Sequence, residues 1–153
     1  ANLRNVAFGN STFVACGADG ATYTSANGSS WTSGSTVVSN FLNGITFGNN
    51  IFIAVGASGS LIKSTDNGST FAAGNSQVST NLYSIAYGNS IFVAVGSNTV
   101  IASTDNTGST FSIKETTLSF NDVTFGNGVF VAVGNNEIIY TSTDGDSWTK
   151  VYP

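Results

Sequence analysis

Hydrophobic and polar residues follow a two-residue period within most segments of the chain, which predicts β-strands and not amphipathic helices. Runs such as VAFGN (residues 6–10) and FVACG (residues 13–17) are rich in β-branched and aromatic side chains. A Gly-Asn pair lies where the first run ends, and such pairs tolerate the positive φ angles of a tight turn. These two runs therefore predict a β-hairpin closed by a Gly-Asn turn.

The hairpin pattern is repeated along the chain. FGN or YGN begins at Phe8, Phe47, Tyr87 and Phe125, with spacings of 39, 40 and 38 residues. A third apolar run follows each hairpin, and after a polar segment a fourth run begins at Trp31, Phe71, Phe111 or Trp148. A repeat of about 40 residues with four strands is typical of a β-propeller blade, whereas a β-sandwich, the alternative, has no reason to repeat at this period.

The sequence thus predicts an all-β fold: a single β-propeller domain built from four four-stranded antiparallel blades. The expected repeats cover residues 1–38, 39–78, 79–117 and 118–153, approximately. Both faces of an interior blade are covered by its neighbours, which explains strand sequences such as FVAVG that do not alternate with polar residues.

The polar segment before each fourth strand carries a further pattern. STDNGSTF at residues 64–71 resembles the Asp-box, or bacterial neuraminidase repeat, S-x-D-x-G-x-x-W with Phe allowed at the end. The third copy has one extra residue, the fourth is one residue shorter, and the first has Asn in place of Asp. The matching residues are Ser25, Asn27, Trp31, Ser64, Asp66, Gly68, Phe71, Ser103, Asp105, Gly108, Phe111, Ser142, Asp144 and Trp148.

Asp-box propellers occur in sialidases, in some glycoside hydrolases, in photosystem assembly factors and in many surface and phage proteins, and there the box is a structural turn. The resemblance implies the same role here. An Asp or Asn side chain can accept hydrogen bonds from backbone N–H groups two or three residues on, and the aromatic residue can pack against its own blade. Calcium binding is the alternative, but each segment lacks the closing Glu and the converging oxygens that calcium needs. We expect neither a metal nor a cofactor.

Charge narrows the range of partners. Charged residues make up 8% of the chain, against about 25% in typical soluble domains, and only four side chains are basic. Clustered Lys and Arg cannot be assembled, so nucleic-acid binding is not expected. No run of 18 apolar residues is present, so membrane insertion is not expected either. Low charge with abundant Ser, Thr, Asn and Gly favours a secreted, cell-surface or virion-associated protein.

The residue inventory argues against catalysis. The chain contains no His, which excludes a Ser-His-Asp triad, and Arg4 is the single Arg, so the three-Arg carboxylate clamp of sialidases cannot form. Cys16 occupies the place of a Val in the other repeats and is read as a buried apolar side chain. A carboxylate pair such as Asp19 with Asp122 stays open if the first and last repeats are neighbours. We predict a non-enzyme, with a glycoside-hydrolase-like remnant as an alternative.

One face of the predicted disc varies from repeat to repeat. It carries the turns between the second and third strands and the links before the first strands, and variable loops on a fixed scaffold are typical of recognition. Its polar, amide-rich surface suits sugar hydroxyls or another protein, so we predict a non-catalytic module that binds a glycan or protein surface; an assembly scaffold of the photosystem-factor kind is the alternative. The candidate ligand-binding residues are Asp19, Asn43, Ser58, Tyr83, Asn98, Asn121 and Asn136.

Ring closure has three alternatives: a closed four-blade ring, two chains that form a larger ring, or a fragment of a longer propeller. Unpaired blade faces at residues 1–38 and 115–153 would expose an apolar patch too large for a monomer. We therefore expect either self-closure, which would bring Arg4 near Asp122, or homo-oligomer formation through the terminal blades.

Overall fold

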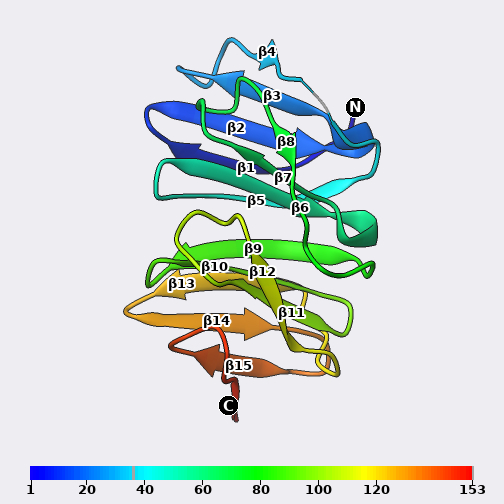
Figure 1. The fold of residues 1–153 in the computed structure, drawn as a ribbon, viewed down its shortest axis with the longest axis vertical. Helices are drawn as coiled ribbons and strands as arrows, with labels where there is room; N and C mark the ends of the chain where they lie inside the picture. The colour runs from blue at the N-terminus through cyan, green and yellow to red at the C-terminus, as the bar shows by residue number, and fades with distance from the viewer. Residues whose placement is uncertain (36, 153) are drawn as a thin grey trace.

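The computed structural model describes residues 1–35 and 37–152, and within them the chain folds into four separate four-stranded antiparallel sheets (Figure 1). This confirms the predicted four-blade propeller architecture. In each sheet the strands pair in chain order, as a meander. We call the sheets blades one to four, in chain order.

The strand bounds are as follows. Blade one contains β1 (Leu3–Gly9), β2 (Thr12–Gly17), β3 (Thr22–Ser25) and β4 (Thr32–Ser33). Blade two contains β5 (Leu42–Gly48), β6 (Ile51–Gly56), β7 (Leu61–Ser64) and β8 (Ala72–Ala73). Blade three contains β9 (Leu82–Gly88), β10 (Ile91–Gly96), β11 (Thr99–Ser103) and β12 (Phe111–Glu115). Blade four contains β13 (Asp122–Gly126), β14 (Val129–Val133), β15 (Ile139–Ser142) and β16 (Thr149–Val151). Two short 3-10 turns, η1 (Ala18–Gly20) and η2 (Ala57–Gly59), join the second and third strands of blades one and two.

The hairpin turns lie one residue later than the sequence pattern predicts. Asn10 and Ser11 have φ angles of 46° and 57°, and Asn89 and Ser90 have φ angles of 47° and 64°. Gly9 is the last residue of β1 and pairs with Thr12, so it is not part of the turn. The turn pair is therefore the Asn and the residue after it, and the preceding Gly has another role.

That role is to admit an aromatic ring from the next blade. A Cβ atom on Gly9 would overlap the ring of Phe47, the hairpin aromatic residue of the next blade. The same contact recurs along the arc, between Gly48 and Tyr87 and between Gly88 and Phe125. Each ring also packs on the Phe of its own second strand, with centroid separations of 4.6 to 4.8 Å in all four blades.

The hydrophobic core lies between the blades. Three clusters of buried side chains fill the spaces between blades one and two, two and three, and three and four. The first strands β1, β5, β9 and β13 contact one another in sequence, which places them at the inner side of the arc. Most core residues come from the first three strands of each blade, and these are the runs in which the sequence shows little alternation.

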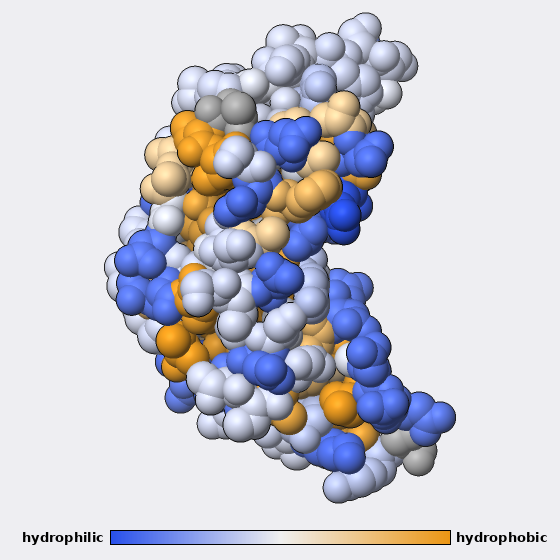
Figure 2. Space-filling view, turned by 90° about the vertical axis from the view of Figure 1, so that its right-hand side faces the viewer, coloured by the Kyte–Doolittle hydropathy of each residue, from blue (hydrophilic) through white to orange (hydrophobic). Residues whose placement is uncertain are grey.

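The four blades form an open arc and not a closed ring. Figure 2 shows a crescent that is hollowed on one side, with blades one and four at its opposite ends (Figures 1 and 2). Arg4 lies over the ring of Phe41, 4.9 Å from its centroid, while Asp122 accepts a hydrogen bond from Ser84 Oγ at 2.6 Å. The predicted self-closure, with Arg4 near Asp122, is therefore wrong.

Candidate ligand-binding site

A polar hollow lies on the inner strands of the arc. It has a volume of about 460 Å³ and is lined by Arg4, Asn43, Tyr83 and Asn121. Each of these residues stands four positions before the aromatic residue of its hairpin, so the four blades place equivalent side chains around one space. We call this space the axial hollow. Its lining differs in every blade except for the two Asn residues, while the scaffold beneath is repeated.

Hydrogen bonds hold three of the four side chains. Asn43 Nδ2 donates to the Leu82 carbonyl at 2.8 Å, Tyr83 Oη lies 2.7 Å from Ser97 Oγ, and Asn121 Nδ2 donates to Asn135 Oδ1 at 2.9 Å. The amide oxygens of Asn43 and Asn121 and the second N–H of each amide remain for a ligand within the described part of the chain.

Arg4 contributes the positive charge of this hollow. The face of its guanidinium rests on Phe41, which leaves the N–H groups at its edge free of ion pairs and hydrogen bonds to residues 1–35 and 37–152. Five planar donors in a partly apolar setting suit carbonyl or carboxylate oxygens. The sequence analysis did not include Arg4 among the ligand-binding residues, although its position four residues before Phe8 was a sufficient signal.

The predicted ligand-binding residues divide into two groups. Asn43, Tyr83 and Asn121 meet in the axial hollow. The other four, Asp19, Ser58, Asn98 and Asn136, lie in the turns between second and third strands, and all four have positive φ angles, between 47° and 57°. Asp and Asn, and to a smaller degree Ser, tolerate this left-handed conformation, so turn geometry alone explains these residue types.

These turns are fastened to the links between blades. The Ser58 N–H donates to Asn81 Oδ1 at 3.0 Å, and the Asn98 N–H donates to Ser119 Oγ at 2.9 Å. Because Asn81 and Ser119 lie in the links that lead into the first strands of blades three and four, the turns lie at the same end of the blades as the axial hollow. They lie at the edge of this hollow, whose lining residues belong to the first strands or, for Asn121, directly precede one.

The Asp-box residues occupy the opposite corner of each blade, where they bond to their own turn. Asp66 Oδ1 accepts from the Thr70 N–H at 2.9 Å and Asp66 Oδ2 from Thr70 Oγ1 at 2.6 Å, while the Gly68 N–H donates to Ser64 Oγ at 2.9 Å. Asn27 replaces Asp in blade one, where its Oδ1 accepts from the N–H groups of Ser29 and Ser30, both at 2.9 Å.

Equivalent bonds are present in blades three and four. Asp105 Oδ1 accepts from the Thr107 N–H at 2.8 Å, and Asp144 Oδ1 accepts from the N–H groups of Asp146 and Ser147 at 2.8 and 2.9 Å. The pKa values of these carboxyl groups are lowered in consequence. The Thr70 hydroxyl and N–H lower the pKa of Asp66, those of Thr107 lower the pKa of Asp105, and the N–H groups of Ser147 and Asp146 lower the pKa of Asp144.

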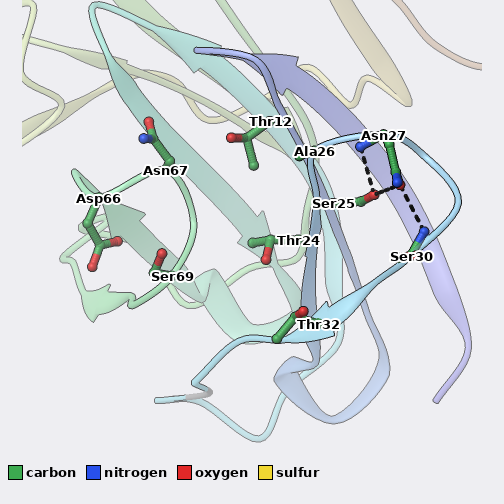
Figure 3. Close-up of a pocket in the computed structure, with 10 residues that line it drawn as sticks. All are labelled: Thr12, Thr24, Ser25, Ala26, Asn27, Ser30, Thr32, Asp66, Asn67 and Ser69. Atoms are coloured by element: carbon green, nitrogen blue, oxygen red, sulfur yellow. Dashed lines mark hydrogen bonds between the residues drawn. The ribbon is translucent and has the colours of Figure 1, made fainter.

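A second hollow, of about 490 Å³, lies between the Asp-box turns of blades one and two (Figure 3). We call it the rim hollow. Figure 3 shows Thr24 and Thr32 of blade one on one side and Asp66, Asn67 and Ser69 of blade two on the other. The turn bonds already engage Asp66 and Asn27, whereas the hydroxyl groups of Thr24, Thr32 and Ser69 have no hydrogen bond to other described residues.

Reactive groups are sparse in the described residues. The Cys16 thiol is fully buried, and burial raises its pKa to about 12, which suits an apolar filler and not a nucleophile. Asp19 and Asp122, the carboxylate pair considered from the sequence, lie in the end blades of the open arc. In residues 1–35 and 37–152 no three His, Cys, Asp or Glu side chains gather as a metal ion requires.

The described chain has no helix with the length and apolarity to cross a membrane.

Comparison with known proteins places the fold. No protein-family model matches the chain, and no curated protein matches its sequence. Similar solved structures include YCF48 bound to a D1 peptide, with a TM-score of 0.76 and 16% identity over 98% of this chain. They also include an ancestral GH74 enzyme, with a TM-score of 0.75 and 18% identity over the whole chain, and the computationally designed Ika4 protein, with a TM-score of 0.72 and 13% identity.

These similarities support a β-propeller. The chain spans 55% of the YCF48 chain, 24% of the ancestral GH74 chain and 91% of the Ika4 chain. At such low identity the similarity concerns the fold alone, and the function has to be argued from the site.

Proposed function

We propose that the chain is a non-catalytic recognition module that binds an extended segment of another protein in the axial hollow. One observation carries the proposal: the same position of four repeats, occupied by Arg4, Asn43, Tyr83 and Asn121, lines one space. A repeated scaffold with an unrepeated lining is what a binding surface requires, because the strands fix the geometry while the side chains define the ligand.

The chemistry of the hollow favours a polypeptide ligand. Asn side chains present both a donor and an acceptor, so they can pair with the C=O and N–H groups of an extended backbone. The Arg4 guanidinium adds donors for a carbonyl or an acidic side chain, and the Tyr83 ring adds apolar contact area. We therefore expect a peptide with an acidic residue placed against Arg4. The YCF48 structure, which has a D1 peptide bound, lends support because its fold is similar.

The non-catalytic part of the proposal is supported by the state of the acidic residues. Asp66, Asp105 and Asp144 are engaged in turn hydrogen bonds, Asp146 is paired with Lys114 Nζ at 2.7 Å, and Asp122 accepts from Ser84. These partners support a structural role for the five carboxyl groups over the paired catalytic role that glycoside hydrolysis needs. We also propose a secreted, cell-surface or virion location, which rests on the low charge of the chain.

A peptide-display selection tests the proposal. Random peptides selected on the immobilised chain are measured by calorimetry against the wild type, Tyr83→Ala and Arg4→Gln. We expect a loss of about tenfold or more in affinity for Tyr83→Ala, as for a central contact residue. Arg4→Gln should weaken binding of the acidic peptides most. Ser69→Ala, in the rim hollow, is the matched control and should bind as the wild type does.

Two results would contradict a peptide site in the axial hollow. One is a set of selected peptides that bind wild type, Tyr83→Ala and Arg4→Gln equally. The other is a selection that enriches no peptide. Circular dichroism on each variant shows whether it is folded, which separates loss of contact from loss of structure.

Saccharide binding in the rim hollow is the second candidate, favoured by the unengaged hydroxyl groups of Thr24, Thr32 and Ser69. The hydroxyl and amide groups around the rim hollow can form hydrogen bonds with the hydroxyl groups of a sugar. A glycan array with wild type and Thr24→Val separates the candidates. Binding that Thr24→Val abolishes and Tyr83→Ala leaves intact supports the rim hollow, whereas an array without binding rejects it.

A further inference from the structure

Each blade packs on the next at three interfaces within the chain. At the two ends of the arc, the surfaces equivalent to the two sides of such an interface are exposed. In blade one, Leu3, Val6 and Phe8 are exposed to 51%, 55% and 57%. The residues at the same positions in blade two are Leu42, Ile45 and Phe47, of which Leu42 and Ile45 are 0% and 5% exposed. Blade one therefore presents the surface with which blades two, three and four each cover the preceding blade.

Blade four presents the complementary surface. A Cβ atom on Gly126 would have no heavy atom within 4 Å, although the equivalent Gly9, Gly48 and Gly88 are each covered by an aromatic ring. Val133 is 40% exposed, while Val55 and Val95 at the same position are fully buried. No aromatic ring of the described residues packs on Gly126. Phe8, the hairpin aromatic residue of blade one, is in turn not among the rings that pack on these glycines.

We propose that two copies of the chain associate head to tail, blade one of each copy packing on blade four of the other, to form an eight-blade ring. Phe8 of one copy then lies on Gly126 of the other, and Leu3 and Val6 cover Val131 and Val133. The same contact occurs twice around a two-fold axis. Two crescents close in this way, so no apolar end is left to continue a filament (Figure 2).

Hydrogen bonds between neighbouring blades also recur at equivalent positions. The turn residues Asn49 and Asn89 donate through Nδ2 to carbonyl groups of the Asp-box turn one blade further on, Asn106 at 2.9 Å and Thr143 at 2.8 Å. Asn127 is the equivalent residue of blade four and meets the Asn27 turn of the second copy in the proposed ring.

An apolar groove also lies on the free surface of blade one. A hollow of about 320 Å³ on blade one is lined by Leu3, Arg4, Asn5, Val6, Ala15 and Trp31. Trp31 is 41% exposed, whereas the equivalent Phe71 and Phe111 are 5% and 3% exposed. A second copy is the occupant that fits, because blade four carries the same residue pattern that blades one to three use to receive their neighbours.

The mass of the 153-residue chain in solution is the first test. Light scattering after gel filtration should give twice the chain mass of 15.6 kDa. Gly126→Leu fills the seat for Phe8, and nothing in the chain itself obstructs the new side chain, so this variant should be a folded monomer. Thr149→Leu, which also places a Leu on blade four but at an exposed position of the outer strand β16, is the control and should remain dimeric.

A disulfide test fixes the register. In a Cys16→Val background, Phe8→Cys combined with Gly126→Cys should yield a covalent dimer under oxidising conditions. Gly88→Cys with Phe125→Cys is the positive control and should yield a disulfide within one chain, because a Cβ atom on Gly88 would lie against the Phe125 side chain. A wild-type monomer, a disulfide-closed monomer of the Phe8→Cys/Gly126→Cys chain, or a ladder of larger oligomers would each overturn the two-copy ring.

Discussion

Blade three and blade one are built from the same residue pattern, but only blade three has a neighbour on both faces. Phe92 of blade three is fully buried and packs on Tyr87 with 4.6 Å between ring centroids. Phe13 of blade one makes the same contact with Phe8 at 4.6 Å and is only half-buried. We call the packed interface between two neighbouring blades a seam. The difference shows that apolar side chains are buried in the seams and not within a single sheet.

The largest expected effect comes from truncating the two rings. Phe92→Ala leaves a cavity in a closed seam and should lower the free energy of unfolding by about 3–5 kcal/mol. Phe13→Ala removes a ring that is partly solvated already and should cost roughly 1–2 kcal/mol. Urea unfolding of both variants, compared in monomeric Gly126→Leu background, measures the difference. Equal losses would mean that burial within the sheet, and not the seam, sets stability.

A smaller effect is expected at the corners of the blades. Asp66→Ala removes the acceptors of the Thr70 N–H and hydroxyl and should lower the free energy of unfolding by about 1 kcal/mol. Asn27→Ala, at the equivalent corner of blade one, should have a similar effect because Asn27 Oδ1 also accepts two hydrogen bonds, from the N–H groups of Ser29 and Ser30. Peptide binding should be unchanged in both variants, which distinguishes these turns from the axial hollow.

The smallest expected effect is the change in the free energy of unfolding at acidic pH. The pKa values of Asp66, Asp105 and Asp144 are lower in the folded chain than the ordinary carboxyl value, so the unfolded chain binds more protons in acid. Their contribution is complete above the unfolded pKa and is lost as pH falls through the folded pKa. The free energy of unfolding should therefore decline below about pH 4. Asp66→Asn should flatten this decline, and an unchanged slope would show that Asp66 does not contribute.

The sequence predicted the blades because their signals are local. The hairpin aromatics at 38- to 40-residue spacing and the polar segment at residues 64–71 each belong to one blade, and local hydrogen bonds satisfy them. Three residues of the axial hollow, Asn43, Tyr83 and Asn121, were also predicted, since position within a repeat determines which end of a blade a residue occupies.

The contacts between blades were not predictable in the same way. The hairpin pattern suggested a turn role for Gly9, and only the packing of Phe47 across the seam reveals its actual one. Arg4 was expected near Asp122, but Phe41 provides a contact within the next blade that the strand pattern does not signal. The open arc depends on packing between residues of different blades, so it could not be derived from the repeat alone.

A matched pair of glycine variants tests the central claim, that an aromatic ring seated on the preceding blade's glycine holds each seam together. Gly88→Leu and Gly126→Leu make the same change at equivalent positions, one beneath Phe125 and one uncovered within the chain. Near-ultraviolet circular dichroism with urea titration should show that Gly88→Leu loses cooperative unfolding, while Gly126→Leu keeps it as a monomer. Cooperative unfolding of both variants with equal midpoints would contradict the account.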